Sequence, residues 1–441
     1  MTMLDWKSEY SKRLMTADEA VKRIKSGDRV SAPNAAGEAK HIIAAMVANK
    51  DAYRDVEICQ MLPMGGAAYA NPGLEKHFRH ISQFVGGMTR ETIRAGHGDY
   101  TPCYFSQIPN LWARTLPLNV AIVHVSAPDR HGFCSCGVSV DYSLHAAENA
   151  KANGGIVIAQ VNRHMPRTHG DTFIHVSKMD CIVEHDEPIT ELPLPVITDV
   201  ELAIGRHCAS LINDGDCLQL GIGSMPDAVL LSLKDKNHLG IHSEMFSDGA
   251  IELVEAGNID NSRKNIHKGK MIATFLIGTK RLYDFVDDNP MVYMAPTTYT
   301  NDPYIAGQND NLVSINSALQ IDFLGQVCAE TIGTMQYSAV GGQVDFVRAA
   351  ALSKGGRSII ALPSTASGEK VSRIVPYIDQ GAAVTTSRND VEYVITEYGI
   401  ANLKYYTVRE RAKSLIRIAH PKFRDWLWDE YERRFNAKAE R

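Results

Sequence analysis

The chain has 441 residues, and its 46 Lys and Arg against 51 Asp and Glu give a formal net charge of −5. Hydrophobic residues make up 44% and charged residues 22% of the sequence, which is typical of a globular protein and excludes a disordered or fibrous chain. Because the net charge is negative, no broad positive field is available to hold a polyanion, and we expect no nucleic-acid partner.

The N-terminal segment 1–15 carries charges throughout and lacks the apolar stretch of a signal peptide. No run approaches the roughly 20 apolar residues of a membrane span. The eight Cys and sixteen His are dispersed, without the spacing of a zinc site. The sequence therefore predicts a cytoplasmic protein with reduced thiols, no membrane partner and no metal.

Short β-branched runs alternate along the chain with segments of helical period. The runs 121–125, 155–159 and 358–362 predict buried strands, and the segments 201–212 and 249–256 predict helices. This alternation is typical of an α/β protein with mostly parallel sheets.

A polar, proline-rich segment suggests a boundary between two domains. Residues 184–195 contain three Pro among charged and polar residues, as a linker does. We therefore predict a first domain at 1–192 and a second at 193–441.

The two halves also share a local pattern. Residues 24–46 and 212–233 each read as a helix end, a Gly-Asp turn, a short strand, a loop of small residues and an amphipathic helix. Gly27 and Gly215 correspond, at an offset of 215 − 27 = 188 residues. Such a turn is common, but together with the proline-rich segment it favours two related α/β domains.

The first candidate for chemistry is the glycine loop 221–226, Gly-Ile-Gly-Ser-Met-Pro, between a predicted strand and a helix. Two Gly let a ligand approach the backbone, and N–H groups at a helix start attract an anion or a developing oxyanion. The alternative is a tight turn that binds nothing. The loop is not the dinucleotide fingerprint, because Asp227 stands where a third small residue would open the helix.

The second candidate is Glu244, which follows the short predicted strand 239–241. Open α/β sheets carry their reactive groups at the carboxyl ends of strands. Ser247 or Asp248 then fits the N-cap of the helix that follows. Glu244 is a nucleophile, a base or simply a partner of a helix N-terminus, and the residues around it leave these alternatives open.

The third candidate is the pair Gly341 and Gly342, which precedes a predicted helix and offers backbone N–H donors. Gln343 and Asp345 line a site in one interpretation, and Asp345 caps the helix in the other. Lys354 follows that helix and supplies a cation, or it is a solvated charge on a turn.

The first domain contains two further loops with polar side chains, 96–102 and 125–133. Either loop could shape a ligand pocket where the two domains meet, a common place for ligands. His97 and His131 are candidate acid/base groups, although a loop His is more often hydrogen-bonded structure.

Taken in order, these segments resemble the family I coenzyme A transferases, in particular the 4-hydroxybutyrate and butyrate CoA-transferases, which are similar to acetyl-CoA hydrolase/transferases. The resemblance covers nearly the whole chain. It implies two open α/β domains of similar topology, the fold of the NagB/RpiA/CoA-transferase class, and a homo-oligomer.

The resemblance also implies roles for individual residues. In the family, the Glu of a Ser/Thr-Glu-x-x-x-Asp-Gly segment is the covalent nucleophile, and this position is Glu244 here. Backbone amides of the glycine loop and the Gly-Gly turn serve the thioester oxygen, which points to Ile222 and Gly342. The implied CoA-binding residues are Gly221, Ile222, Gly223, Ser224, Met225, Gly341, Gly342 and Lys354.

The implied activity is the transfer of CoA between a short-chain acyl-CoA and a free acid such as butyrate, 4-hydroxybutyrate, acetate, succinate or itaconate. It proceeds by ping-pong kinetics through a glutamyl-CoA thioester, and it needs no metal because both nucleophiles are anions. The nearest alternative is an acyl-CoA hydrolase with the same intermediate. A nucleotide-dependent oxidoreductase, which the incomplete glycine fingerprint disfavours, and a non-catalytic acyl-CoA sensor are the others.

Overall fold

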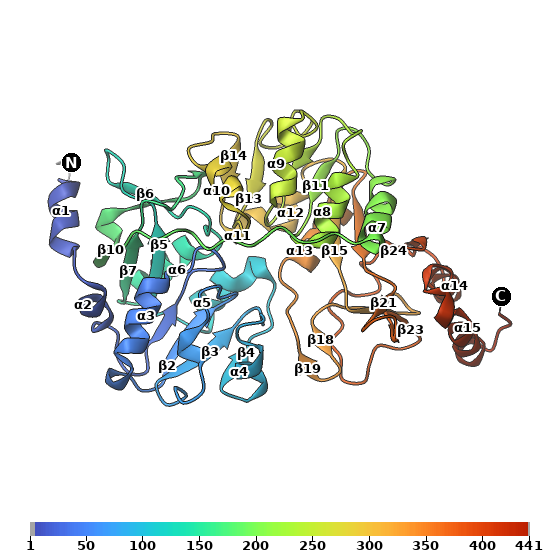
Figure 1. Cartoon of the computed structure of the whole chain (residues 1–441), viewed down its shortest axis with the longest axis horizontal. Helices are drawn as coiled ribbons and strands as arrows, with labels where there is room; N and C mark the ends of the chain where they lie inside the picture. Colours follow the sequence, from blue (N-terminus) through green and yellow to red (C-terminus); the bar gives the residue numbers. More distant parts are fainter. Residues whose placement is uncertain (1–4, 440–441) are drawn as a thin grey trace. The chain divides into compact units, whose positions relative to one another are not determined.

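The computed structural model describes residues 5–439. The chain forms two compact units: the first comprises the residues up to Pro193 together with Ile272–Thr300, and the second comprises Leu194–Met271 and the chain from Asn301 onward (Figure 1). The predicted domains are continuous stretches, 1–192 and 193–441. In the structure the segment Ile272–Thr300 instead packs with the first unit, although it lies within the second half of the chain.

The first unit is built on a seven-stranded sheet in which neighbouring strands run parallel. β-branched residues dominate β5 and β7, which are buried almost throughout, as expected for a parallel sheet covered on both faces. In spatial order the strands are β10 (Cys181–Glu184), β7 (Ile156–Val161), β5 (Val120–Val125), β1 (Arg29–Ser31), β2 (Val56–Gln60), β3 (Phe78–Ser82) and β4 (Gly98–Tyr100).

Helices and small sheets surround this central sheet. The α2 and α3 side chains share one hydrophobic core with β1, β2 and β5. The helices of the unit are α1 (Trp6–Arg13), α2 (Ala17–Val21), α3 (Lys40–Ala48), α4 (Arg90–Arg94), α5 (Ile108–Arg114), α6 (Ser143–Ala152), α10 (Lys280–Val286) and α11 (Thr297–Thr300). The short strands are β6 (Phe133–Ser135), β8 (His169–Gly170), β9 (Phe173–His175), β13 (Met271–Ala273), whose first residue belongs to the second unit, and β14 (Val292–Met294).

The second unit has a six-stranded sheet, parallel except for its last strand. In spatial order its strands are β12 (Gly240–Ile241), β11 (Cys217–Gln219), β15 (Leu312–Ser317), β20 (Arg357–Ala361), β24 (Tyr393–Thr396) and β25 (Gly399–Asn402). Short strands fill the loops of this sheet: β16 (Gln320–Asp322), β17 (Val327–Cys328), β18 (Thr331–Ile332), β19 (Met335–Gln336), β21 (Thr365–Ala366), β22 (Val371–Ser372) and β23 (Ile374–Val375).

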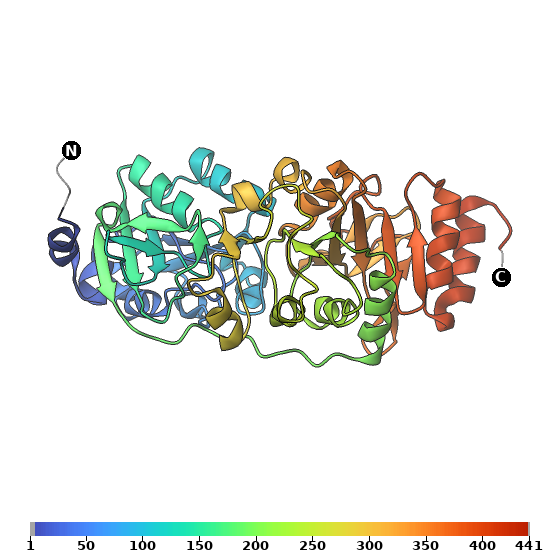
Figure 2. The same cartoon turned by 90° about the horizontal axis from the view of Figure 1, so that it is seen from above.

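Up to residue 439, seven helices of the second unit pack around its sheet. Beside β25, α14 and α15 lie against each other, drawn in red in Figure 2, and bury Leu415, Leu427 and Trp428 in a common core. The helices are α7 (Asp199–Ala209), α8 (Ser224–Leu231), α9 (Asp248–Glu255), α12 (Pro303–Ala306), α13 (Gln343–Leu352), α14 (Val408–Ile418) and α15 (Pro421–Phe435).

These elements confirm the predicted fold class. The predicted strands correspond to β5, β7 and β20, and the predicted helices to α7 and α9, with ends that differ by at most three residues. Corresponding strands have the same spatial order in both sheets. The order β2-β1-β5-β7-β10 in the first unit corresponds to β12-β11-β15-β20-β24 in the second. The two units therefore share one topology, as predicted.

The paired Gly-Asp turns mark the start of this shared topology. Gly27 and Gly215 both have positive φ, 79° and 83°, just before β1 and β11. The carboxylate of Asp28 accepts a hydrogen bond from the N–H of Lys25, and that of Asp216 accepts one from Asn213, both at 2.7 Å. The same local contact thus precedes the corresponding strands β1 and β11 of the two sheets.

Two further features bear on the expected class of protein. No helix within residues 5–439 is both long enough and apolar enough to cross a bilayer. The eight Cys are free thiols, seven buried and Cys103 partly exposed.

We expect acid to destabilise the first unit because of two buried histidines. Burial lowers the pKa of both His80 and His124 to about 4, from an ordinary value near 6.5. Between these values each histidine binds more protons in the unfolded chain than in the folded one, so its contribution to stability falls as the pH drops from about 6.5 to 4. Each histidine contributes up to about 3 kcal/mol to this loss. Asp141 acts in the opposite direction, because burial raises its pKa to about 7.

Urea unfolding monitored by circular dichroism at pH 7, 6, 5 and 4.5 measures the effect. His124→Gln should lose less stability across this range than the parent. His131→Gln, a change at an exposed loop histidine, is the control and should keep the parent's pH dependence. Equal losses in the parent and His124→Gln would contradict the assignment.

Candidate active site

Glu244 lies at the carboxyl edge of the second unit's sheet, three residues beyond the end of β12. On either side of it, Ser243 and Met245 are buried, 1% and 6% exposed, while Glu244 itself is partly buried. The Ser243 hydroxyl donates to the carbonyl oxygen of Leu220 at 2.8 Å, and its oxygen accepts the Leu220 N–H at 3.2 Å. Met245 forms an antiparallel bridge with Leu220. The Glu244 loop is thereby attached to the start of the glycine loop.

Two other segments meet the Glu244 carboxylate. The Nδ2 group of Asn301 donates a hydrogen bond to its Oε2 at 2.8 Å. Gly342 also lies against it: a Cβ atom added to Gly342 would come closer than 3.0 Å to both Oε2 of Glu244 and Nδ2 of Asn301. No side chain therefore fits at position 342 unless Glu244 moves.

In the glycine loop 221–226, the backbone at Gly223 adopts a conformation that few other residues tolerate, and the side chains of Ser224 and Met225 contact other parts of the second unit. Gly223 has φ of 108°, a conformation that favours glycine, and α8 begins at the next residue. The Ser224 hydroxyl hydrogen-bonds to the Glu201 carboxylate, and the Met225 sulfur accepts from Ser317 at 3.8 Å. These two side chains thus have structural contacts, and Gly221 lies one residue after the Leu220 anchor.

Two backbone N–H groups in the glycine loop and the Gly-Gly turn have no partner among the described residues. Across residues 5–439, the N–H groups of Ile222 and Gly342 make no hydrogen bond to another residue. Gly342 is the N-cap residue of α13, so its N–H lies outside the helical hydrogen-bond ladder. Each group is able to donate to a negatively charged oxygen.

The residues after the Gly341-Gly342 pair begin α13. Gln343 donates from Nε2 to the carbonyl oxygen of Ser317 at 2.6 Å and accepts the Thr386 hydroxyl at 3.0 Å. Its amide thus has structural partners at both ends. Asp345 is buried, with 3% of its surface exposed.

Lys354 lies away from this group of residues. It is exposed and follows the last turn of α13, whose ten residues span about 15 Å from the end at Gly342. The chain continues from there into β20, so Lys354 lies at the amino edge of the sheet, opposite Glu244. The structure brings Glu244 and Gly342 together and joins the Ile222 loop to the Glu244 loop through Leu220, but it separates Lys354 from Gly342 by the length of α13.

Sequence reasoning missed two residues at the carboxyl edge. Asn301 has no motif around it, and only its contact with Glu244 identifies it. Arg373 follows the carboxyl end of β20; its N–H donates to the Ser364 carbonyl oxygen at 2.9 Å and its Nη1 to the Ala318 carbonyl oxygen at 3.0 Å. The rule that ligands bind beyond the carboxyl ends of strands would have favoured Arg373 over Lys354.

The polar loops of the first unit have structural explanations. Asp129 accepts from the N–H groups of His131 and Phe133 at 2.8 and 3.0 Å and pairs with Arg167 at 3.0 Å. His131 is exposed, and His97 pairs with Glu75 at 3.2 Å near the surface. These contacts fold the loops, and they give neither histidine a catalytic arrangement within the first unit.

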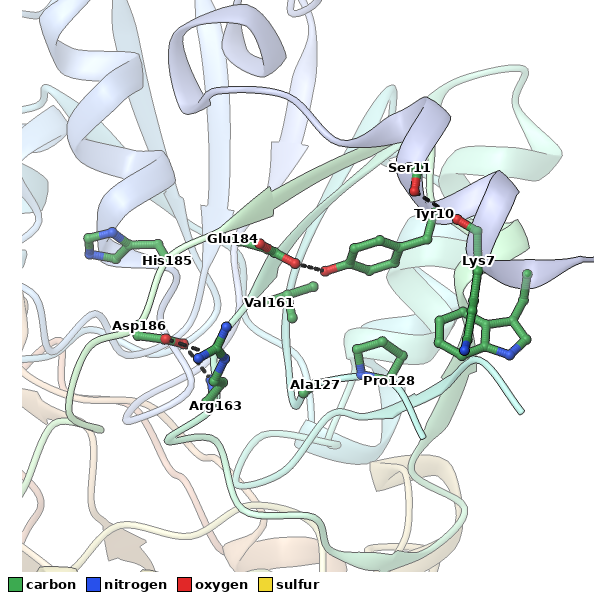
Figure 3. A pocket seen from close by; sticks show the side chains of 11 residues that line it. Lys7, Tyr10, Ser11, Ala127, Pro128, Val161, Arg163, Glu184, His185 and Asp186 are labelled. Carbon is green, nitrogen blue, oxygen red and sulfur yellow. Dashed lines mark hydrogen bonds and ion pairs between the residues drawn. The ribbon is translucent and has the colours of Figure 1, made fainter. Parts of the chain in front are cut away.

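The first unit also contains a hollow of about 450 Å³ that none of the predicted site residues lines. Figure 3 shows α1 on one side and Ala127, Pro128 and Val161 on the other. Three of its charged side chains have partners, because the Tyr10 hydroxyl donates to Glu184 at 2.7 Å and Arg163 lies 3.6 Å from Asp186.

Comparison with known proteins gives a consistent result along the chain. The family model described as the acetyl-CoA hydrolase/transferase N-terminal domain matches residues 1–193, and the corresponding C-terminal domain matches residues 278–431. The 4-hydroxybutyrate coenzyme A transferase of Clostridium kluyveri is 55% identical over 433 residues, 98% of this chain and 100% of that protein. The butyryl-CoA:acetate CoA-transferase of Anaerostipes caccae is 38% identical and covers 98% of each chain.

Solved structures agree with these relatives. The crystal structure of RipA from Yersinia pestis superposes with a TM-score of 0.92 at 39% identity, over 98% of this chain and 100% of that one. The 4-hydroxybutyrate CoA-transferase of Porphyromonas gingivalis gives a TM-score of 0.85 at 42% identity, with the same coverage. The chain therefore belongs to the acetyl-CoA hydrolase/transferase family.

Proposed function

We propose that this protein is a CoA-transferase that moves CoA between a short-chain acyl-CoA and a free carboxylic acid, with Glu244 as the nucleophile. The observation that carries the proposal is the carboxylate of Glu244, held by Asn301 and pressed against the backbone of Gly342. The chain is similar to enzymes named for 4-hydroxybutyrate, for butyryl-CoA and acetate, and for succinyl-CoA, which supports butyrate, 4-hydroxybutyrate, acetate and succinate as substrates. Itaconate is a further small dicarboxylate that we propose.

The chemistry begins with attack of the Glu244 carboxylate on the thioester carbonyl of acyl-CoA. The C–S bond breaks, which leaves a mixed anhydride on Glu244 and the CoA thiolate. The thiolate then attacks the glutamyl carbonyl, which forms a glutamyl-CoA thioester and releases the first acid as its carboxylate. An incoming carboxylate reverses both steps and leaves as the new acyl-CoA.

Each attack places negative charge on a carbonyl oxygen. We propose that the N–H groups of Ile222 and Gly342 donate to this oxygen. Neither has a partner among the described residues, Gly342 lies against the carboxylate, and Ile222 belongs to the loop that Leu220 joins to the Glu244 loop. One such donor typically contributes about 3–4 kcal/mol to the transition state. The CoA thiol end is then expected along Gly221, Gly223, Ser224, Met225 and Gly341, whereas Lys354 is too remote for this part of the cofactor.

A hydrolase using the same glutamyl intermediate is the second candidate, because the matching family includes acetyl-CoA hydrolases. In that reaction water instead of a carboxylate attacks the glutamyl thioester. Comparison of CoA release in buffer with CoA transfer to added acetate, butyrate or succinate decides between the two. We expect transfer to exceed release.

The direct test is mass spectrometry of the full-length protein after incubation with acyl-CoA alone. We expect the peptide containing Glu244 to carry a CoA adduct that borohydride reduction removes. An unmodified peptide in a protein that turns over acyl-CoA would contradict the mechanism.

Asn301→Ala is expected to lower kcat for CoA transfer by roughly 10- to 100-fold, because loss of the hydrogen bond lets the Glu244 carboxylate rotate away from its attacking position. Steady-state kinetics with an acyl-CoA donor and a carboxylate acceptor measure the change. Asn389→Ala, at an exposed position of the same unit, is the control and should keep the parent rate. An unchanged rate in Asn301→Ala would show that the hydrogen bond does not orient the nucleophile.

We further infer a cytoplasmic homo-oligomer that requires no resident metal for turnover. The proposed steps use two anionic nucleophiles and backbone donors, so they call for no Lewis acid. Light scattering of the purified protein measures the oligomeric state, and dialysis against a chelator should leave kcat unchanged.

A further inference from the structure

Asp227 is a buried acid for which the proposed chemistry has no use. It lies in the first turn of α8, directly after the glycine loop, and only 9% of its surface is exposed. Its Oδ1 accepts a hydrogen bond of 2.6 Å from the hydroxyl of Ser247. Ser247 is itself 6% exposed and is the N-cap residue of α9, three residues after Glu244.

This contact is the second of two connections between the same pair of loops. The first joins Leu220 to Ser243, just before the glycine loop and just before Glu244. The second joins Asp227 to Ser247, just after each of them. The backbone of Ile222 and the side chain of Glu244 both lie between the two connections. The two connections together restrain movement of the glycine loop relative to the Glu244 loop.

The surroundings of Asp227 are unfavourable for a carboxylate. Burial raises its pKa, and the nearby acids Asp248 and Glu252 raise it further, while the Ser247 hydrogen bond lowers it. A charge in such a place costs folding free energy that a neutral residue would avoid. The Ser247 hydrogen bond is the favourable contact of Asp227 there, and it joins the two loops of the candidate site.

We propose that Asp227 is a positioning residue for thioester transfer: through Ser247 it holds the glycine loop at the distance from which the Ile222 N–H reaches the carbonyl oxygen attacked by Glu244. This inference rests on the proposed function. It also explains why an acid stands at the position where a dinucleotide-binding loop would have a small residue.

The test measures the single-turnover rate of glutamyl-CoA formation in the full-length protein for Asp227→Ala, Ser247→Ala, the double variant and Asp227→Asn. We expect each alanine variant to lose about tenfold, as a shift of under 1 Å in a reacting group does. The double variant should lose no more than either single variant, because all three break one contact. Asp227→Asn keeps an acceptor oxygen for Ser247 and should restore most of the rate, with KM for acyl-CoA nearly unchanged throughout.

Ser232→Ala is the matched control, because Ser232 lies at the end of the same helix and its hydroxyl donates only to the Ala228 carbonyl oxygen at 2.9 Å. It should form the adduct at the parent rate. A parent rate in Asp227→Ala, multiplicative losses in the double variant, or a loss in Asp227→Asn equal to that of Asp227→Ala would each overturn the inference. If the parent protein forms no adduct at all, the proposed function fails instead.

Discussion

Replacement of Glu244 by Ala is expected to abolish CoA transfer, with kcat lower by about 10⁴-fold or more. The reason is that every proposed step passes through a bond to this carboxylate, and no other side chain in the described part of the chain is placed to replace it. The fold should persist, because Glu244 is only partly buried and its flanking residues provide the loop's anchors. Transfer from acyl-CoA to acetate, followed by chromatography of the CoA esters, measures the loss.

Glu244→Asp keeps the carboxylate but changes its position, and is expected to give an intermediate loss in the same assay. The shorter side chain withdraws the carboxylate by one methylene, so we expect a loss of about 100-fold and a residual CoA adduct. Glu255→Ala, which removes an exposed acid from the helix that follows, is the matched control and should stay fully active. Substantial turnover in Glu244→Ala would rule out covalent catalysis at this position.

The second large effect is expected for Gly342→Ala. The added methyl group has no space, since its carbon would overlap both the Glu244 carboxylate and the Asn301 amide. The Glu244 carboxylate and the Asn301 amide both have to move, which breaks their alignment with the N–H of residue 342. Loss of both alignments should lower kcat by about 10²- to 10³-fold. The backbone itself tolerates alanine, because φ of Gly342 is −94°.

Gly87→Ala is the control for this substitution, because a Cβ at that exposed glycine meets nothing within 4 Å and its φ is not in the left-handed region. It should leave kcat and the thermal unfolding midpoint unchanged. An unchanged thermal unfolding midpoint of Gly342→Ala would show that its loss of kcat comes from the site and not from unfolding of the protein. A fully active Gly342→Ala would mean that the carboxylate is not held against this backbone when acyl-CoA is bound.

Much of the fold is predictable from local patterns in the sequence. The β-branched runs that became β5, β7 and β20 are read correctly because buried parallel strands are apolar on both faces. The Gly-Asp turns at Gly27 and Gly215 reveal the repeated topology through a local backbone requirement. Local patterns do not predict that Ile272–Thr300 belongs to the first unit. This placement depends on which surface the segment packs against in the folded chain.

Some residues of the candidate site can likewise be identified from the sequence, and others only from the folded chain. Glu244 and Gly342 are found from the sequence, because each belongs to a short motif whose chemistry is recognisable and which matches a known family. Asn301 lies 57 residues after Glu244 and 41 before Gly342, in no motif, and only the folded chain brings its amide to the carboxylate. Lys354 is close to Gly342 in sequence, but α13 carries it to the other edge of the sheet.

The sequence by itself determined the α/β class and the repeated topology and predicted Glu244 as the reactive acid, since these depend on residue type, period and short motifs. Only the tertiary structure decided which groups surround that acid: the Asn301 amide, the Gly342 backbone and the Asp227–Ser247 connection. The physical reason is that a hydrogen bond acts over about 3 Å, a distance that separation along the chain does not specify.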